Sequence, residues 1–235
     1  MKDPIGQAIL DYVKKNINKD IIVKSDICDD DVIPSAYLFR SYEEMPAIEQ
    51  VALKRCSGET LDVGAAAGIH ASYLKERGLE VHCIDISEKS VDYLKSNGHS
   101  AECIDFFDVE DQKYDTVLML MNGLGIAGSL SNLELLLLKA KSLLTENGKI
   151  IADSSDIKYL YQDEDEDGAM WLDLNAEYYG NFKFQMVYGE HTSDWFDWLY
   201  VDFEKLEIAA SKIGLSVNKM YDENDHYLVE MTIIN

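Results

Sequence analysis

A glycine-rich turn between a short apolar strand and a helix most constrains the fold of this 235-residue chain. Residues 61–63 have the pattern of a buried strand, residues 64–68 read Gly-Ala-Ala-Ala-Gly, and residues 69–77 continue as a helix. Glycine in such a turn lets a ligand approach the backbone closely, because no Cβ stands in the way. Asp85 ends the next apolar run, roughly where an acid grips a ribose diol in nucleotide-binding folds. The pattern predicts a site for a ligand that carries a nucleoside.

Strands and helices alternate after this turn, which predicts βαβ units and a parallel sheet. A helix is predicted from Ser87, a good N-cap, to the Asn97-Gly98 stop signal. A capping box at residues 131–134 predicts a second helix that ends near residue 148. The predicted strands of this region are residues 60–63, 80–84, 100–104, 115–121 and 149–153.

The segments on either side of this region do not show the alternation of strands and helices. Residues 1–56 are predicted to be helical and irregular, and to form an N-terminal extension of a domain that covers residues 57–235. An aromatic and acidic insertion occupies about residues 157–200. Inside it, residues 182–188 and 195–201 are predicted to pair as an added β-hairpin.

The C-terminal part of the chain has a pattern of its own. A helix is predicted at residues 203–213, and two strands at residues 215–221 and 226–234 are joined by a polar turn. Such a turn joins antiparallel strands, so we expect the parallel sheet to finish with an antiparallel pair.

Composition limits the partners. The net charge of −23 comes from 44 acidic and 21 basic residues. Such a field repels phosphate backbones, so we expect no nucleic-acid partner and a neutral or cationic substrate. No apolar run approaches the roughly 18 residues that span a bilayer, and the N-terminus lacks a signal-peptide pattern. Four cysteines without Cys-x-x-Cys spacing are typical of reduced thiols, so we expect a cytoplasmic protein with no membrane partner.

We expect no metal site. The five histidines show no ligand spacing. Residues 163–168 imitate the start of a calcium loop, with acids at positions one, three and five and glycine at six. Position twelve is Leu174, where such a loop needs a bidentate glutamate, so this run is interpreted as a solvated acidic loop.

Two kinds of nucleoside cofactor compete for the glycine turn. A nicotinamide site needs Gly-x-Gly-x-x-Gly, with the pyrophosphate on the helix N-terminus. Here the spacing is Gly64-x-x-x-Gly68, and Asp62, just before the turn, would sit poorly beside a pyrophosphate. An acid at this place suits a ligand with an ammonium group and no phosphate, such as S-adenosylmethionine.

At four places the chain resembles the class I S-adenosylmethionine-dependent methyltransferases. Residues 62–68 resemble the first motif of that family, Asp-x-Gly-x-Gly-x-Gly, with Ala66 in place of the middle glycine. Asp85 resembles the acid that holds the ribose hydroxyls, Asp105-Phe106 the pair that brackets the adenine, and residues 114–122 the motif beside the methyl group. The resemblance implies a Rossmann-like three-layer α/β sandwich with a seven-stranded, mostly parallel sheet and an antiparallel last strand.

The resemblance also implies a set of cofactor-binding residues. Asp62 would accept hydrogen bonds from the methionine ammonium side, and Asp85 would bind both ribose hydroxyls. The full set is Asp62, Gly64, Ala65, Ala66, Gly68, Asp85, Ile86, Asp105, Phe106 and Met121. Asp85 as a plain helix-capping residue and Asp105 as a solvated turn residue are the structural alternatives.

Candidate catalytic residues follow from the rule that ligands sit beyond the carboxyl ends of parallel strands. Asn122 and Asp153 fall at two such ends. Asn122 either orients a nucleophile or only forms a turn with Gly123, and Asp153 is either a base or the end of its strand. Two further groups either surround the pocket or serve ordinary packing and surface roles: Tyr37, Arg40 and Tyr42, and the aromatic residues Tyr159, Tyr161, Trp171, Tyr178, Tyr179, Trp195 and Trp198.

The sequence therefore predicts an S-adenosylmethionine-dependent methyltransferase that moves a methyl group by in-line displacement to a small-molecule acceptor. Because the methyl donor is already activated, positioning can supply most of the catalysis, so the sequence indicates the cofactor better than the acceptor. Two alternatives stay open, a cofactor-binding regulatory module that has lost catalysis and a nicotinamide-dependent oxidoreductase. The oligomeric state is not predicted.

Overall fold

The computed structural model describes residues 2–110, 112–161 and 177–234. The acidic run at 163–168 and Trp171 lie outside these residues. None of the described helices is both long enough and apolar enough to cross a membrane.

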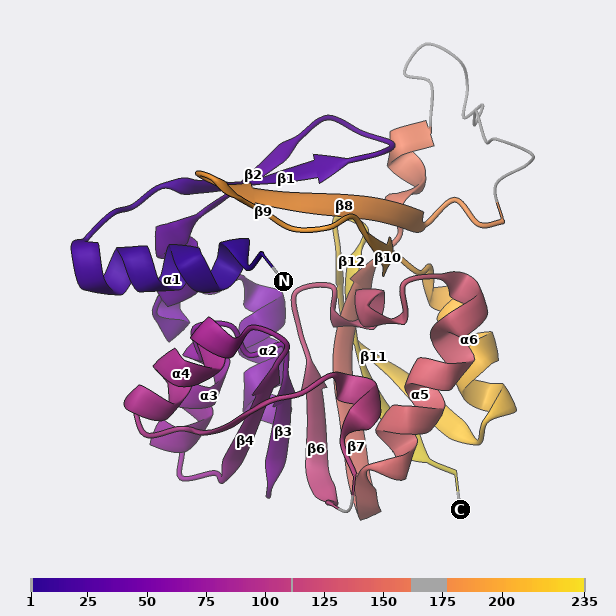
Figure 1. Cartoon of the computed structure of the whole chain (residues 1–235). Helices are drawn as coiled ribbons and strands as arrows, with labels where there is room; N and C mark the ends of the chain where they lie inside the picture. The colour runs from indigo at the N-terminus through magenta and orange to yellow at the C-terminus, as the bar shows by residue number, and fades with distance from the viewer. Residues whose placement is uncertain (1, 111, 162–176, 235) are drawn as a thin grey trace.

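A central sheet of seven strands, counted over the described residues, has the order β11-β12-β7-β6-β3-β4-β5 (Figure 1). Strands β3 to β7 pair in parallel, and β12 pairs antiparallel with both β7 and β11. The prediction of a mostly parallel sheet with an antiparallel last strand is confirmed. The strands are β3 (Thr60–Val63), β4 (Val81–Asp85), β5 (Ser100–Cys103), β6 (Tyr114–Met119), β7 (Leu144–Ser155), β11 (Leu215–Glu223) and β12 (His226–Ile233).

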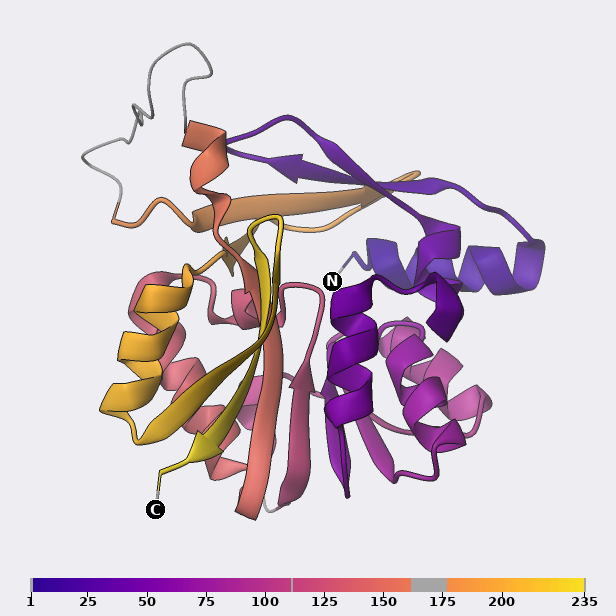
Figure 2. The same cartoon turned by 180° about the vertical axis from the view of Figure 1, so that it is seen from behind.

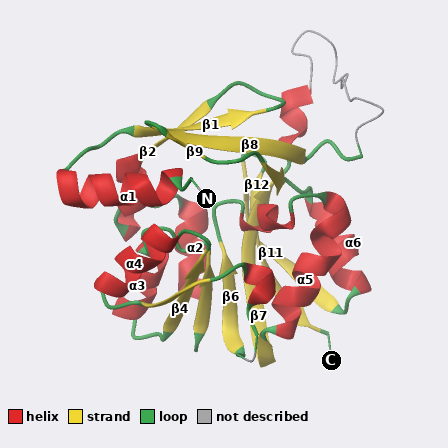
Figure 3. Cartoon of the chain, in the orientation of Figure 1, coloured by secondary structure: helices red, strands yellow, loops and turns green. Residues whose placement is uncertain are grey.

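Helices cover both faces of this sheet (Figure 3). Successive side chains of a strand point to opposite faces, so a continuous apolar run buries both. In β6, Val117 and Met119 join the core formed with α5 and α6, whereas Leu118 joins the core formed with α2 and α3. The helices are α2 (Ala47–Arg55), α3 (Ile69–Glu76), α4 (Glu88–Ser96), α5 (Leu133–Ser142) and α6 (Phe203–Lys212).

A second sheet lies across the carboxyl ends of the central strands (Figure 1). Its order is β10-β8-β1-β2, with β9 paired to β8. Seen from behind, the turn between β11 and β12 rises toward this sheet (Figure 2). The strands are β1 (Asp20–Ser25), β2 (Asp31–Pro34), β8 (Asn181–Tyr188), β9 (His191–Thr192) and β10 (Phe196–Leu199).

The N-terminal segment corrects one prediction. Helix α1 (Pro4–Lys15) and α2 are helical as expected, but residues 20–34 form two strands where a helical and irregular extension was predicted. The β-branched run Ile21-Ile22-Val23 supplies the strand preference, and its main partner is β8, about 160 residues away in sequence. Local periodicity does not reveal such a distant partner.

The predicted hairpin of the insertion forms, within this larger sheet. Strands β8 and β10 are antiparallel and place Phe184 opposite Phe196. Strand β9 occupies the connection and pairs with β8 first. Strand β6 ends at Met119, two residues before its predicted end, because Met121 and Asn122 take left-handed φ values of 64° and 56°.

Candidate active site

The glycine turn joins β3 to α3 and leaves open space in front of its first residue. Gly64, Ala66 and Gly68 have φ values of 72°, 47° and 75°. A Cβ on Gly64 would meet no atom within 4 Å, whereas one on Gly68 would lie 2.4 Å from Leu94 Cδ2. Gly64 therefore faces free space, and Gly68 is required by packing. The backbone N–H groups of Gly64 and Ala65 both bind the carbonyl of Ile84, which ties the turn to β4.

Ala66 holds a conformation that favours glycine, and a hydrogen bond supports it. Its backbone N–H donates to Asp85 Oδ2 over 2.8 Å. Asp85 Oδ1 accepts from the backbone N–H of Ser87, also at 2.8 Å. Asp85 therefore bridges the turn and the start of α4, and it does bond the backbone there, as the helix-capping alternative expected. Each carboxylate oxygen keeps lone-pair capacity beyond these bonds. Burial raises the pKa of Asp85, against the lowering effect of the two backbone donors.

Asp62 is a buried acid with an unsatisfied oxygen. Its side chain sits in β3 at 2% exposure, and Oδ2 has no hydrogen-bond partner among the described residues. Burial raises the pKa of Asp62, and the nearby His70 opposes this rise. Leaving such an oxygen unpaired is costly, so the site fits a ligand that brings a hydrogen-bond donor. A bound ammonium group provides one.

Three further members of the predicted cofactor set, Ile86 and the adenine-bracketing Asp105 and Phe106, divide between surface and core. Ile86 is 63% exposed just after β4. Asp105 is exposed and caps a short helix, where its Oδ1 accepts the backbone N–H of Phe107 at 2.9 Å. This geometry is that of the alternative in which Asp105 is a solvated turn residue. The Phe106 side chain is 4% exposed and belongs to the main core. Only its backbone can face a ligand.

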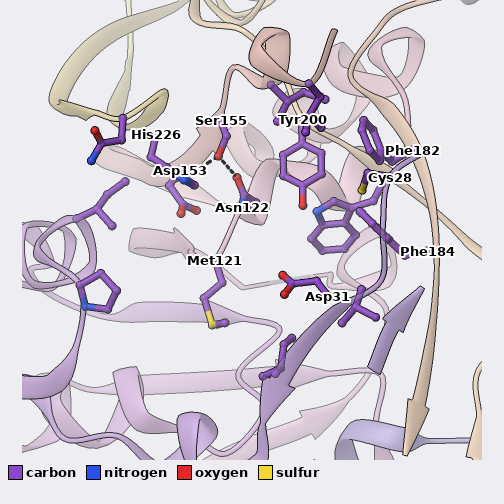
Figure 4. A pocket seen from close by; sticks show the side chains of 18 of the residues that line it. Cys28, Asp31, Met121, Asn122, Asp153, Ser155, Phe182, Phe184, Tyr200 and His226 are labelled. Atoms are coloured by element: carbon purple, nitrogen blue, oxygen red, sulfur yellow. Dashed lines mark hydrogen bonds between the residues drawn. The ribbon is translucent and has the colours of Figure 1, made fainter. Parts of the chain in front are cut away.

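Met121 and Asn122 leave the end of β6 in left-handed conformations and face a large cavity (Figure 4). Asp153, near the end of β7, lies beneath them and accepts the backbone N–H of Gly123 at 3.1 Å. Asp153 is 5% exposed, and burial raises its pKa to about 6. Met121 is 39% exposed. The structure thus brings together the two predicted catalytic residues and one predicted cofactor residue.

The cavity has a volume of about 690 Å³ and lies between the second sheet and the carboxyl ends of β6 and β7. Aromatic rings supply much of its wall: Tyr37, Tyr159, Phe182, Phe184, Phe196, Trp198, Tyr200 and Tyr221. Five acids also line it: Asp29, Asp31, Glu49, Asp153 and Glu223. Among the described residues, its lining includes no lysine or arginine. Figure 4 shows the Asp31 carboxylate directed into the open space near Met121.

The aromatic residues singled out from the sequence take both of the expected roles. Tyr159 and Trp198 line the cavity. Tyr178 and Tyr179 pack together instead. The Tyr178 hydroxyl donates to Asp202 Oδ2 at 2.7 Å, and the Tyr179 hydroxyl donates to Asp156 Oδ1 at 2.8 Å.

A buried charge network behind the cavity was not predicted as a unit. Arg40 Nη2 donates to both oxygens of Glu49, at 2.6 and 2.5 Å, and His70 Nε2 lies 2.8 Å from Glu49 Oε2. The three side chains are at most 8% exposed. Burial alone would raise the pKa of Glu49, but His70 and Arg40 outweigh it and hold that pKa below its ordinary value. The available signal was an acid, Glu49, at helical spacing from the apolar residues Ala52 and Leu53, which are buried with it in α2.

Comparisons with known proteins agree with this geometry. A family model described as a methyltransferase domain matches residues 61–152. A SAM-dependent methyltransferase from Bacteroides fragilis, solved in complex with S-adenosyl-L-homocysteine, shares 40% identity and a TM-score of 0.92, with 100% of this chain and 96% of that chain covered. No curated protein sequence matches significantly.

Two more distant structures share the fold alone. The CcbJ methyltransferase from Streptomyces caelestis has 16% identity and a TM-score of 0.62, with 83% of this chain and 95% of that chain covered. The sugar N-methyltransferase KedS8 from Streptoalloteichus has 15% identity and a TM-score of 0.56, with coverages of 80% and 85%.

The sheet order, the glycine turn and the acid at the end of β4 define a Rossmann-like enzyme built around a nucleoside ligand. The 40% identity to the Bacteroides fragilis methyltransferase over the whole chain identifies the family. The chain belongs to the S-adenosylmethionine-dependent methyltransferases.

Proposed function

We propose that the protein transfers a methyl group from S-adenosylmethionine to a small molecule held in the aromatic cavity. The observation that carries this proposal is the unpaired Asp62 oxygen below a turn whose first glycine faces open space. When bound there, the cofactor supplies a methyl group on a positively charged sulfur. The cavity reaches the same region at Met121, so an acceptor and the methyl group can meet.

The cofactor roles follow from the donors and acceptors in place. Asp62 accepts from the ammonium group of the methionine part, and Asp85 accepts from the ribose hydroxyls. Gly64, Ala65 and Ala66 present backbone, with Gly68 closing the turn. The exposed Ile86 side chain covers one face of the adenine, and Met121 borders the methyl group. Asp105 and the backbone of Phe106 border the other side of the base.

Asn122 and Asp153 serve the transfer step in different ways. No described residue accepts a hydrogen bond from the Asn122 amide nitrogen, so that group is available to orient the acceptor. Asp153 acts through its hydrogen bond to Gly123, which fixes the turn that presents Asn122. Asn122 is therefore the candidate for substrate contact, and Asp153 is a positioning residue.

The acceptor is a small molecule with an apolar or aromatic body and a neutral or cationic functional group. Rings lining the cavity can stack on such a body and attract a cation through their faces. Carboxylates line the same space, and the chain carries a charge of −23, so anionic acceptors are disfavoured. Aligning acceptor, methyl carbon and sulfur in this cavity supplies most of the rate.

Two further proposals concern organisation. We retain the division into an extension at 1–56 and a domain at 57–235, although β1 of the extension pairs with β8 of the insertion. We also propose a cytoplasmic location, which the four cysteines support because none is disulfide-bonded.

Two measurements test the function. Calorimetric titration with S-adenosylhomocysteine should give binding, and Asp85→Ala should weaken it at least tenfold because both ribose bonds are lost. The exposed Asp92→Asn on α4 is the matched control and should bind normally. Turnover of a small-molecule panel with methyl-labelled cofactor separates an enzyme from an inactive binding module. Unchanged affinity in Asp85→Ala contradicts the ribose role, and NADH binding in place of S-adenosylhomocysteine contradicts the function.

A further inference from the structure

Three hydrogen-bonded side chains lie at one end of the cavity, and two of them, Ser155 and His226, have no role in the proposal above. Ser155, the last residue of β7, is 2% exposed and stands between Asn122 and His226. Its Oγ lies 2.8 Å from Asn122 Oδ1 and 2.8 Å from His226 Nδ1 (Figure 4). Strand pairing sets this contact, because His226 lies opposite Ser155 in the antiparallel β7–β12 ladder. All three residues line the cavity.

The proton count in this chain fixes the state of the imidazole. A serine hydroxyl has one proton to donate, and an amide oxygen only accepts. With the Asn122 amide oxygen assigned to the side of Ser155, the hydroxyl donates to Asn122 Oδ1 and its oxygen accepts from His226. His226 therefore carries a proton on Nδ1. In the neutral ring, Nε2 is then the unprotonated nitrogen and the basic one.

We propose that His226 is the general base of the methyl transfer, acting on acceptors whose nucleophilic atom arrives protonated, such as an amine or a phenol. This inference rests on the proposed function. As the bond from the acceptor atom to the methyl carbon forms, the carbon–sulfur bond breaks and its electron pair stays on sulfur. The proton of the acceptor atom passes to His226 Nε2 and later to water. Ser155 keeps accepting from Nδ1 in both states of the ring, so the relay needs no rearrangement.

His226 suits this role better than Asp153, the other candidate at this end of the cavity. Asp153 is 5% exposed and already accepts a backbone N–H, whereas His226 is an exposed residue that borders the open cavity. The titratable groups that share the cavity lining with His226 include Asp153 on β7, Tyr159 on η6 (Ile157–Tyr161), Glu49 on α2, and Tyr221 and Glu223 on β11. Glu223 lies opposite His226 in the β11–β12 ladder, and Asp225 precedes it in the chain and accepts the backbone N–H of Asp156.

The tautomer is the first test, and it needs no acceptor. Long-range ¹H–¹⁵N correlation spectra of the ¹⁵N-labelled protein bound to S-adenosylhomocysteine report which ring nitrogen carries the proton, with His226 assigned by its loss in His226→Gln. We expect a protonated Nδ1 and an unprotonated Nε2, and a shift toward the opposite tautomer in Ser155→Ala. An Nε2-protonated ring in the parent protein overturns the inference.

Acceptor chemistry is the second test. With phenethylamine, p-cresol and thioanisole as probes, His226→Gln should lower kcat for the amine or phenol about 10²- to 10⁴-fold, the usual range for a general base. It should also remove an ionisation from the kcat–pH profile, and leave transfer to the thioether unchanged. His191→Gln, a histidine on β9 outside the cavity lining, is the matched control. An unchanged pH profile with the amine or phenol overturns the inference.

The outcomes separate this inference from the function on which it rests. His226→Gln should bind S-adenosylhomocysteine like the parent, because, among the described residues, the side-chain hydrogen bond of His226 goes to Ser155 and not to a proposed cofactor residue. If the parent fails to bind S-adenosylhomocysteine, the proposed function fails. If it binds but His226 has the opposite tautomer, only the role of His226 fails.

Discussion

Asp153 makes the stability of this fold depend on pH in a way that one substitution can isolate. Burial raises its folded-state pKa from 3.8 to about 6. A carboxyl whose pKa is higher in the folded state binds protons more tightly there, so its ionisation destabilises the fold as the pH rises. The gap of about 2.2 units corresponds to a cost of about 3 kcal/mol, fully developed above pH 6 and absent below pH 3.8. At 5% exposure, little solvent screening reduces this value.

Asp153→Asn removes the ionisation and keeps an oxygen that can accept the Gly123 N–H. The free energy of unfolding of the variant minus that of the parent should therefore rise by about 2–3 kcal/mol from pH 4 to pH 7. A pH-independent effect of the new amide would shift this difference by a constant and leave the rise unchanged. Urea unfolding of both proteins over this range, without cofactor, gives the difference directly. Asp92→Asn on α4 is the control, and its curve should stay parallel to the parent curve. A parallel Asp153→Asn curve would refute the argument that burial controls this carboxyl.

Two further substitutions test the turn and the buried charges. Gly64→Ala should cost about 1 kcal/mol of stability for its left-handed φ and weaken S-adenosylhomocysteine binding at least tenfold, because its Cβ enters the open space. Gly68→Ala should destabilise the fold by about 1–3 kcal/mol more than Gly64→Ala, because its Cβ meets the Leu94 side chain. It should weaken S-adenosylhomocysteine binding less than Gly64→Ala does. Equal losses of affinity in calorimetry would contradict the view that only Gly64 faces the ligand. Arg40→Met should lower the free energy of unfolding by about 3–5 kcal/mol, because Glu49 loses a buried partner. A loss below about 1 kcal/mol in urea unfolding would show that His70 alone suffices.

The proposed cofactor residues lie together in the structure because the signals that placed them are local. The glycine turn joins adjacent elements, and Asp85 meets Ala66 across only 19 positions in the chain. A strand, a turn and a helix in succession fix that geometry with few alternatives. The same holds for Asn122 and Asp153, which fall at the ends of neighbouring parallel strands. Strand ends in a parallel sheet meet at one edge, so sequence position alone places them together.

The acceptor half was less predictable because its contacts join distant segments. Ser155 and His226 are 71 positions apart, and their contact depends on the register of an antiparallel pair. A shift of that register by one residue would turn the histidine to the other face of the sheet. Strand β1 has the same difficulty on one side, since it pairs with nearby β2 but also with β8, about 160 residues away. Composition showed aromatic residues in the insertion but not which rings would line a cavity.

This division has a physical origin in the reaction. The methyl donor has one structure, so one backbone turn and two carboxylates can hold it on the central sheet. In the proposed function the acceptor is enclosed from the opposite side, where rings from β8 and β10 of the second sheet line the cavity together with residues at the ends of β6 and β7. In the proposed arrangement, Met121 and Asn122 lie at the boundary between the two ligands, because they follow β6 at its carboxyl end and line the cavity. Substitutions in the second sheet should therefore change acceptor preference with cofactor affinity intact, and substitutions at the boundary should change the rate of transfer itself.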